Sequence, residues 1–348
     1  MSDMNIQLFV TDLDGTLLPT GRDVPAKNIE AVKRAVAAGV TVTIATGRMY
    51  RAALPVAQAL GVDVPIITYN GALIKSVSGE VYDENYVPTD VVRDVVDFCH
   101  EHSWHVQTYS DDELYFAEHD EKAKGYEAAQ VLAGHTVGWD GLKQHTEHVA
   151  KLLVISDAAE ETAERIELLQ KAFGGRVLAV RSNPEYAEVV LPGVSKASGL
   201  QKLAAKLGIS IENVMAIGDS NNDLPMLEAA GHSVAMGNAL PEVKAASDYT
   251  VGTCEEHGFA EAIERFVLHD NLKKRHPLDC ARPRRHAAEL GKAHLATHDG
   301  GAPRGHGERR PRHDCDRAHA RRRGDVRAAV RCKCAAHLLQ WRRRAGHG

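Results

Sequence analysis

The sequence has no apolar run approaching the roughly 18 residues that a membrane-spanning helix requires. Its first residues, Met1 to Met4, carry neither the basic nor the apolar segment of a secretory signal, so none is predicted. Cysteine is scarce, because only six are scattered along 348 residues, and this argues against a disulfide framework. The apolar content of 44% and charged content of 26% are ordinary for a globular chain. We therefore predict a cytoplasmic protein without a membrane span.

Residues 271–348 lack several residue types altogether. They contain no Ile, Phe, Tyr, Met or Ser, and a segment without these residues has little from which to build a core. They hold 21 Lys and Arg against 7 Asp and Glu, a net charge of about +14, whereas residues 1–270 carry about −19. The overall net charge of −5 hides this change. We predict a basic tail of low order after residue 270.

Three hypotheses compete for this tail. Its arginine runs, Arg321–Arg323 and Arg342–Arg344, would attract nucleic-acid phosphates. Cys315, Cys332 and Cys334 could ligate a metal with nearby histidines, although they lack the usual zinc-site spacing. We favour the third hypothesis, in which the aperiodic, Ala- and Arg-rich segment is a reading frame translated out of register. A nucleic-acid partner is therefore not expected unless the tail is genuine.

The remaining chain shows two different patterns of strands and helices. Residues 1–82 follow a strand–helix–strand–helix–strand pattern, which predicts a parallel sheet with helical crossovers. Residues 83–187 contain short strands close together in sequence, which favours antiparallel pairing. The first pattern resumes over residues 188–270. We predict an α/β protein with a Rossmann-like parallel-sheet core, into which an α+β module is inserted at residues 83–187.

Two carboxylates stand at the end of the first predicted strand. Asp12 and Asp14 follow an apolar run directly, and Gly15 and Thr16 then form a turn. Ligands bind at the carboxyl ends of strands in open α/β sheets. A carboxylate there can attack a phosphoryl group, and a second one can transfer the proton. A capped turn without chemistry is the alternative for this pair taken alone.

Three further segments place polar groups near predicted core strands or helix starts. Thr46 and Gly47 could cradle an anion at a helix N-terminus, and we expect Arg48 to be a solvated side chain. Lys196 at a helix start opposes the helix dipole, which is easier to understand if it faces a phosphate. Alternatively, these groups are helix caps and an ordinary surface lysine.

The last of these segments is Gly-Asp-Ser-Asn-Asn-Asp at residues 218–223. Asp219 at the strand tip could supply a hard oxygen ligand for Mg2+, which takes few protein carboxylates. Asp223, one helical turn later, suits an indirect role. The alternative is a turn rich in side-chain caps.

In their order and spacing these motifs resemble the haloacid dehalogenase (HAD) superfamily, and within it the Cof-type hydrolases of subfamily IIB. The resemblance covers residues 5–268 and also includes Tyr-Asn-Gly-Ala at residues 69–72. It implies a HAD core with an inserted cap of type C2B that closes over the substrate.

The resemblance also implies roles for single residues. Asp12 would be the nucleophile, and Asp14 the general acid and base. The Mg2+ ligands would be Asp12, Asp14 through its backbone carbonyl, and Asp219, with Asp223 nearby. Phosphate would be held by Leu13, Thr46, Gly47, Lys196 and Asn222. In the cap, His105, Tyr109, Tyr115 and Glu185 could contact substrate, but packing roles are equally expected.

The function implied is a Mg2+-dependent phosphatase that hydrolyses small phosphorylated metabolites, such as sugar phosphates or phosphorylated cofactors, through an aspartyl-phosphate. One alternative is a sugar phosphomutase of the same fold. Another is a non-enzymatic binding protein with a nucleic-acid-binding tail, against which the intact Asp12, Asp14, Lys196 and Asp219 argue.

Overall fold

The computed structural model describes residues 4–19, 23–61 and 63–268. The predictions for the basic tail at residues 271–348 lie outside the described residues. Within the described part of the chain, no helix combines the length and the apolar character needed to cross a bilayer.

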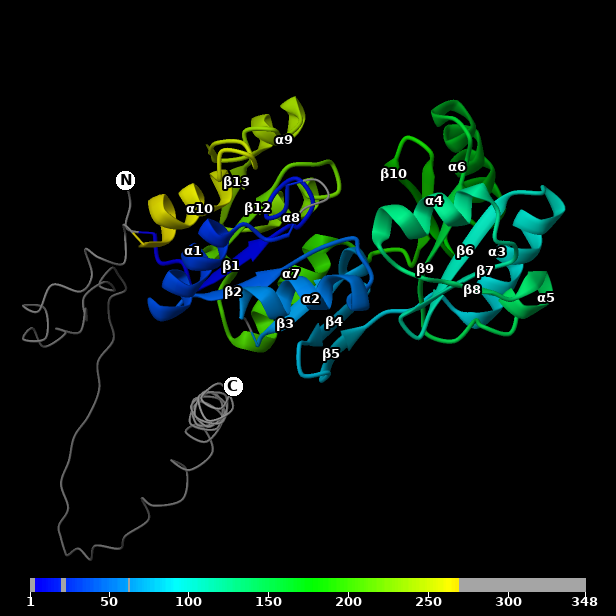
Figure 1. The fold of residues 1–348 in the computed structure, drawn as a ribbon, viewed down its shortest axis with the longest axis horizontal. Helices are drawn as coiled ribbons and strands as arrows, with labels where there is room; N and C mark the ends of the chain where they lie inside the picture. The colour runs from blue at the N-terminus through cyan, green and yellow to red at the C-terminus, as the bar shows by residue number, and fades with distance from the viewer. Residues whose placement is uncertain (1–3, 20–22, 62, 269–348) are drawn as a thin grey trace, which may run out of the picture. The chain divides into compact units, whose positions relative to one another are not determined.

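A five-stranded sheet, in which every paired neighbour is parallel, forms the part of the chain that we call the core (Figure 1). The strand order is β14-β13-β12-β1-β2. The strands are β1 (Leu8–Thr11), β2 (Thr41–Ile44), β12 (Val214–Gly218), β13 (His232–Ala235) and β14 (Tyr249–Thr250). Strand β1 pairs with both β12 and β2, so segments about 200 residues apart meet at the centre of the sheet.

Helices cover both faces of this sheet. The central strands β1 and β12 are buried along their whole length, which requires cover on each side. Helix α1 packs against α10 and the π-helix η3, whereas α7 packs against α8. The helical segments are α1 (Ala26–Ala37), α2 (Tyr50–Leu60), α7 (Lys196–Leu207), η2 (Ile211–Asn213), α8 (Leu224–Ala229), α9 (Pro241–Ala246), α10 (Gly258–Ala262) and η3 (Ile263–Leu268).

A small antiparallel sheet adjoins strand β2. Its strands are β3 (Pro65–Thr68), β4 (Leu73–Ser76) and β5 (Val81–Glu84), and the short helix η1 (Tyr69–Gly71) joins the first two. A parallel bridge between Ala45 and Ile67 connects β3 to the end of β2. Strand β3 is predicted from the sequence, but the β4–β5 hairpin is not, because its short strands lack clear apolar alternation.

A second large sheet, with six strands, lies between β5 and α7 in the sequence, and we call this part the cap. Its order is β10-β11-β9-β6-β7-β8, and every pair except β7–β8 is antiparallel. The strands are β6 (His105–Ser110), β7 (Glu113–Phe116), β8 (His135–Thr136), β9 (Val149–Ile155), β10 (Leu178–Asn183) and β11 (Tyr186–Val190). The helices are α3 (Thr89–Glu101), α4 (Glu121–Gln130), α5 (Gly138–Leu142) and α6 (Ala159–Phe173).

This architecture confirms the predicted fold class, a parallel α/β core with an inserted α+β cap. The cap has its own hydrophobic cluster, which includes Val92, Val96 and Leu152. The expected limits at residues 82 and 187 fall within β5 and β11. The exact extent of the inserted module therefore stays a prediction.

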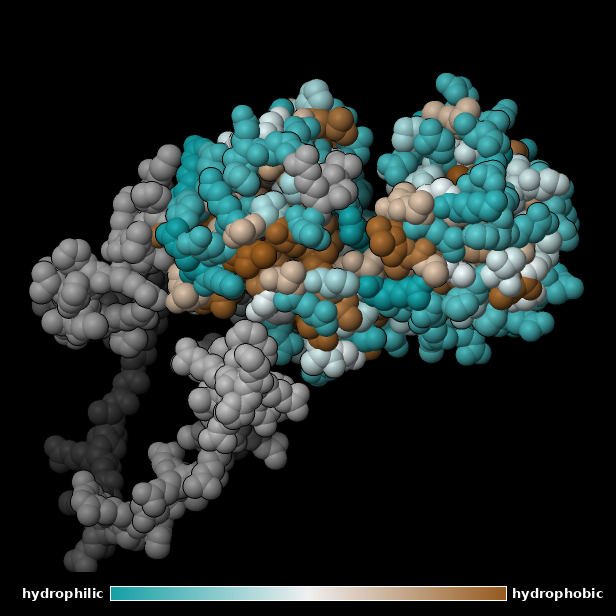
Figure 2. Space-filling view, viewed as in Figure 1, coloured by the Kyte–Doolittle hydropathy of each residue, from teal (hydrophilic) through white to brown (hydrophobic). Residues whose placement is uncertain are grey.

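The face of the molecule in Figure 2 is mostly hydrophilic, with apolar side chains visible in a few places. The most exposed large apolar side chains of the described residues are Val131, Val36 and Val81. They belong to separate elements, and single exposed apolar side chains are normal in globular proteins.

Candidate active site

Asp12 and Asp219 meet because their strands are parallel neighbours. Thr11 at the end of β1 is in register with Ile217 of β12, so both chains leave the sheet at the same edge. The Asp12 N–H donates to the Ile217 carbonyl at 3.1 Å, which extends the ladder by one residue. The parallel topology thus brings the first and the last predicted site segments to one place.

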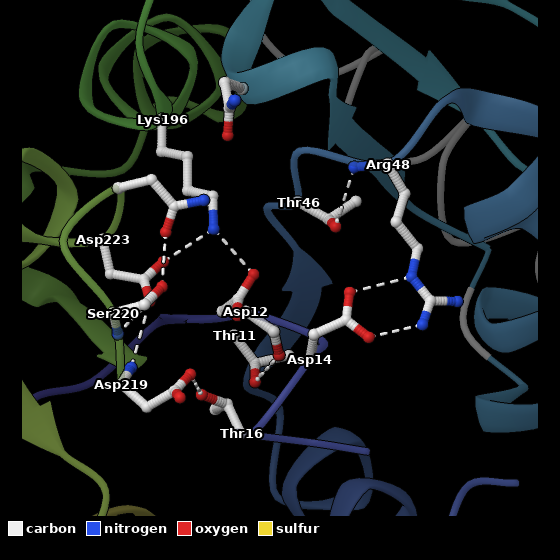
Figure 3. Close-up of polar contacts among 12 residues, drawn as sticks. Thr11, Asp12, Asp14, Thr16, Thr46, Arg48, Lys196, Asp219, Ser220 and Asp223 are labelled. Atoms are coloured by element: carbon white, nitrogen blue, oxygen red, sulfur yellow. Dashed lines mark hydrogen bonds and ion pairs between the residues drawn. The ribbon is translucent and has the colours of Figure 1, made fainter. Parts of the chain in front are cut away.

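Lys196 joins this cluster from the first residue of helix α7. Ser195 caps the helix in a capping box with Ser198, which fixes where the helix begins. The Lys196 Nζ donates to Asp12 Oδ1 at 2.6 Å and to Asp223 Oδ1 at 2.7 Å (Figure 3). Lys196 is fully buried, so the alternative of a surface lysine is wrong.

The ammonium of Lys196 stays charged in this setting. Burial by itself would lower its pKa, but the Asp12 and Asp223 carboxylates outweigh burial and raise the pKa above its ordinary value. A permanent positive charge therefore lies beside the carboxylate that we expect to be the nucleophile.

Asp223 is held on both of its oxygens. Its Oδ1 binds Lys196, and its Oδ2 accepts the backbone N–H groups of Asp219 and Ser220, each at 3.0 Å. A Cβ at Gly218 would lie 2.6 Å from Asp223, so only glycine permits this approach. Asp223 thus shapes the loop that presents Asp219.

Asp219 is fixed from the other side by the turn after Asp14. The Thr16 hydroxyl donates to Asp219 Oδ1 at 2.9 Å (Figure 3). Gly15 has φ of +78°, and a Cβ there would lie 2.4 Å from Asp219 Oδ2. Glycine is needed at this position for both reasons.

The cluster has the chemistry of a divalent-cation site. Asp12, Asp219 and Asp223 each offer a carboxylate oxygen within 4.8 Å of the others. Burial, with a further contribution from the charge of Asp223, raises the pKa of Asp12 to about 8 and that of Asp219 to about 6. Lys196 alone does not neutralise three carboxylates, and a hard cation would offset the remaining charge. The residues present therefore fit Mg2+.

Asp14 lies outside this cluster. Its side chain is 58% exposed and turns toward Arg48, whose Nε donates to Oδ2 at 2.9 Å and whose Nη2 contacts Oδ1 (Figure 3). The expectation that Arg48 is a merely solvated side chain is wrong, because it forms a two-point ion pair with Asp14.

A cavity of about 570 Å³ collects most of the predicted residues. Asp12, Asp14, Thr46, Gly47 and Asn222 line it directly. Lys196, Asp219 and Asp223 are not among the lining residues, but Lys196 bonds Asp12 and Asp223, and a carboxylate oxygen of Asp219 lies within 4.8 Å of those of Asp12 and Asp223. Leu13 connects the two aspartates, and its side chain is fully buried.

The cap supplies further lining residues that are not predicted from the sequence. They include Tyr126, Lys151, Tyr186 and Glu188. Lys151 Nζ donates to Glu188 Oε1 at 2.8 Å, and both side chains are buried. The available signal was a lysine within the apolar run of β9, all of which is buried.

The four cap residues considered as substrate contacts have other surroundings. None is among the residues that line this cavity. The Tyr109 ring packs against Tyr69, Tyr115 stacks on His145, and His105 Nδ1 bonds Asp120 at 2.9 Å. The Glu185 carbonyl accepts the N–H of Ser156 in the sheet. Packing and structural contacts account for these four residues.

A family model described as haloacid dehalogenase-like hydrolase matches residues 9–263. The 5-amino-6-(5-phospho-D-ribitylamino)uracil phosphatase YcsE of Bacillus subtilis strain 168 is 31% identical over 76% of this chain and 98% of its own. The crystal structure of a haloacid dehalogenase-like hydrolase from Bacteroides thetaiotaomicron has a TM-score of 0.70 and 33% identity, and the match covers 75% of this chain and 99% of that one. The structure of the HAD subclass IIB sugar phosphatase BT4131 has a TM-score of 0.65 and 27% identity, over 75% and 98%.

Proposed function

Because the chain belongs to the haloacid dehalogenase-like hydrolases, we propose that it is a Mg2+-dependent phosphatase of small phosphorylated metabolites. The named relatives are phosphatases of a phosphorylated ribityl compound and of sugar phosphates. One observation carries the proposal: Asp12 lies at a strand end, bound to a buried Lys196, beside two more carboxylates and at the wall of a cavity. A cytoplasmic location stays a prediction from the sequence.

We assign the residues as follows. Asp12 is the nucleophile and Asp14 the general acid and base. The phosphate is held by Leu13 (through its backbone N–H), Thr46, Gly47, Lys196 and Asn222. Mg2+ would be held by Asp12, the Asp14 carbonyl and Asp219. Asp223 is the least direct member of the metal set, because Lys196 and two backbone N–H groups already occupy its oxygens.

In the first step, an Asp12 carboxylate oxygen attacks phosphorus. The bond between phosphorus and the ester oxygen breaks, and an aspartyl-phosphate forms. Asp14 gives its proton to the leaving oxygen. Lys196 holds Asp12 in orientation and places a fixed positive charge beside the transferring group.

In the second step, Asp14 takes a proton from water, and the water oxygen attacks phosphorus. The bond to Asp12 breaks, which releases inorganic phosphate and restores the carboxylate. Asp14 already lines the cavity but is paired with Arg48. We infer that this exposed pair opens when substrate arrives, so that Asp14 can turn toward the leaving oxygen.

Mg2+ bound by Asp12 and Asp219 would screen the negative charge that the substrate phosphate brings to this cluster of three carboxylates. The cap would exclude bulk water and select the leaving group through residues such as Tyr126 and Tyr186.

The test is the release of inorganic phosphate from a panel of phosphorylated metabolites, with and without Mg2+. We expect turnover that requires Mg2+ and that is lost in Asp12→Asn. Turnover that survives Asp12→Asn would remove Asp12 as nucleophile. Interconversion of sugar phosphates without phosphate release would indicate a phosphomutase instead.

A further inference from the structure

Two core segments meet next to the proposed phosphate site, and one of them contains its residues Thr46 and Gly47. One runs from Thr46 to Arg51, and the other is the short helix η1. The Tyr69 N–H donates to the Arg48 carbonyl at 3.0 Å, and the Asn70 N–H donates to the Thr46 carbonyl at 2.9 Å. A Cβ at Gly47 would lie 3.1 Å from the Asn70 side chain. The position of η1 therefore determines the position of Thr46 and Gly47.

Helix η1 adopts an unfavourable backbone. Tyr69 and Asn70 are consecutive residues with φ of 51° and 54°, in the left-handed region that a bulky residue such as tyrosine rarely enters. Such backbone conformations are energetically unfavourable and persist only where the surrounding contacts hold them. The question is which contacts hold these two.

For Tyr69 the contact is Asp112, at the tip of the β6–β7 hairpin of the cap. The Tyr69 hydroxyl donates to Asp112 Oδ1 at 2.8 Å. The other oxygen, Oδ2, accepts the backbone N–H of Arg51 at 2.9 Å, in the first turn of α2. One cap carboxylate thus joins both core segments and also satisfies an N–H at a helix start.

For Asn70 the contact is Glu188 of β11. The Asn70 Nδ2 donates to Glu188 Oε2 at 3.0 Å. The other oxygen, Oε1, binds Lys151, and the same Lys151 Nζ donates to the Gly47 carbonyl at 3.2 Å. A second cap carboxylate therefore joins the same two segments, this time through a buried lysine.

We propose that Asp112 and Glu188 are positioning residues, two cap carboxylates that fix η1 and the segment from Thr46 to Arg51 in the geometry that holds phosphate. The proposal rests on the proposed function, since it assigns phosphate binding to Thr46 and Gly47. It makes phosphate affinity depend on how the cap is seated. Misplacement of binding groups by about 1 Å can cost about 100-fold in rate.

The test compares Asp112→Ala with Asp112→Asn, and with Glu113→Gln as the matched control. Glu113 is the next residue of the hairpin and also pairs with Arg51, but through the partly buried guanidinium instead of the backbone N–H. We expect Asp112→Ala to lower kcat by about 10-fold or more for every phosphomonoester, small aryl phosphates included. The inhibition constant of inorganic phosphate should rise by a similar factor. Asp112→Asn should recover much of the loss, and Glu113→Gln should change little.

Tyr69→Phe is the second variant, because it removes one hydroxyl and leaves the buried ring in place. It should weaken phosphate inhibition even if Asp112→Ala folds poorly. Unchanged phosphate inhibition in a folded Asp112→Ala or Tyr69→Phe would overturn the proposal, as would a loss confined to large substrates. If the wild type bound phosphate but hydrolysed no ester, the proposed function would fail. Phosphate affinity measured by calorimetry with Mg2+ would still test the positioning role.

Discussion

Lys196 in the core and Lys151 in the cap are both buried, but different charges surround them. Lys196 bonds Asp12 and Asp223, with Asp219 beside them, so three carboxylates share one ammonium. Lys151 bonds one carboxylate, Glu188, and lies over the Tyr109 ring. The first group has excess negative charge, whereas the second is neutral as a pair.

The difference separates two uses of a buried charge. A cluster with excess negative charge is unfavourable unless it binds a cation, and this is the signature expected of a reactive site. A balanced buried pair contributes position more than reactivity, and it is rarely retained for stability alone. We therefore infer that the cluster around Lys196 takes part in the reaction, and that Lys151 with its partner holds the core segments in position.

The largest effect should come from Asp12→Asn, which removes the proposed nucleophile. We expect kcat to fall by about 10⁴-fold or more, while the folded state survives because a crowded negative charge is removed. The measurement is steady-state phosphate release together with a thermal unfolding curve. Residual activity within about 10-fold of the wild type would make the unbalanced cluster structural instead.

The next test replaces each of the two lysines by methionine in a separate variant. Lys196→Met and Lys151→Met should each destabilise the protein by about 3–5 kcal/mol, because each leaves a buried carboxylate without its partner. Lys196→Met should also lower kcat by about 10²–10³-fold, since it removes a charge beside the transferring phosphoryl group, whereas Lys151→Met should lower kcat less, because it disturbs only the alignment of the segment that holds phosphate. Urea unfolding and kcat would be measured on both. Equal losses of kcat would contradict the division of roles.

The double variant Lys151→Met/Glu188→Leu serves as a control for the cap pair. Replacement of a buried ion pair by apolar residues is often neutral for stability, so the double variant should be more stable than Lys151→Met. Phosphate should still bind more weakly, because the bond from Asn70 to Glu188 is lost. Full recovery of both properties would show that the pair does not align the core.

Removal of the metal should give a smaller, pH-dependent effect. Burial raises the pKa of Asp12 to about 8 and of Asp219 to about 6, from 3.8. Between 3.8 and these raised values the folded protein holds more protons than the unfolded chain. The contribution of the two carboxyl groups to stability therefore falls as pH rises through this window. We expect Mg2+ at 100 times its Kd at pH 8 to raise Tm by about 5 °C at that pH, and the same Mg2+ concentration to raise Tm by less at about pH 5.

Asp219→Asn is the matched variant for the metal prediction. It should reduce both the Mg2+-induced rise in Tm and its dependence on pH, because a proposed ligand and a titrating group are lost together. A rise in Tm that is equal at both pH values, and unchanged in Asp219→Asn, would place the cation elsewhere.

The smallest effect should come from the exposed pair of Asp14 and Arg48. Exposed ion pairs contribute about 0–1 kcal/mol, so Arg48→Ala should change the free energy of unfolding by at most about 1 kcal/mol. A double-mutant cycle with Asp14→Asn, measured in urea, gives the coupling directly. A coupling above about 2 kcal/mol would mean that this pair resembles the buried ones.

The sequence predicts the residues around Asp12 because the patterns that reveal them are local in the chain. Asp12, Thr46 and Asp219 each follow a recognisable buried strand, and parallel topology brings such strand ends together. Lys196 is predicted from a conflict with the helix dipole, and its burial between two carboxylates is consistent with that conflict. The parallel sheet itself follows from the alternation of strands and helices.

The contacts between cap and core are not predicted, because they depend on tertiary placement. Asp112 lies in a hairpin turn rich in acidic residues, where it looks like an ordinary turn residue. Its two partners, Tyr69 and Arg51, are about 40 and 60 residues away in sequence. The left-handed conformation of Tyr69 also contradicts local propensity, so tertiary contacts must impose it.

The central claim, attack by Asp12 on phosphorus, is best tested in the Asp14→Asn variant with an aryl phosphate whose leaving group needs no proton. Acid quench during turnover, followed by peptide mass spectrometry, would show where phosphate is attached. We predict that one phosphoryl group accumulates on the peptide at Asp12, because its hydrolysis requires Asp14. Release of inorganic phosphate with no phosphoryl group on Asp12 at any time point would contradict the account.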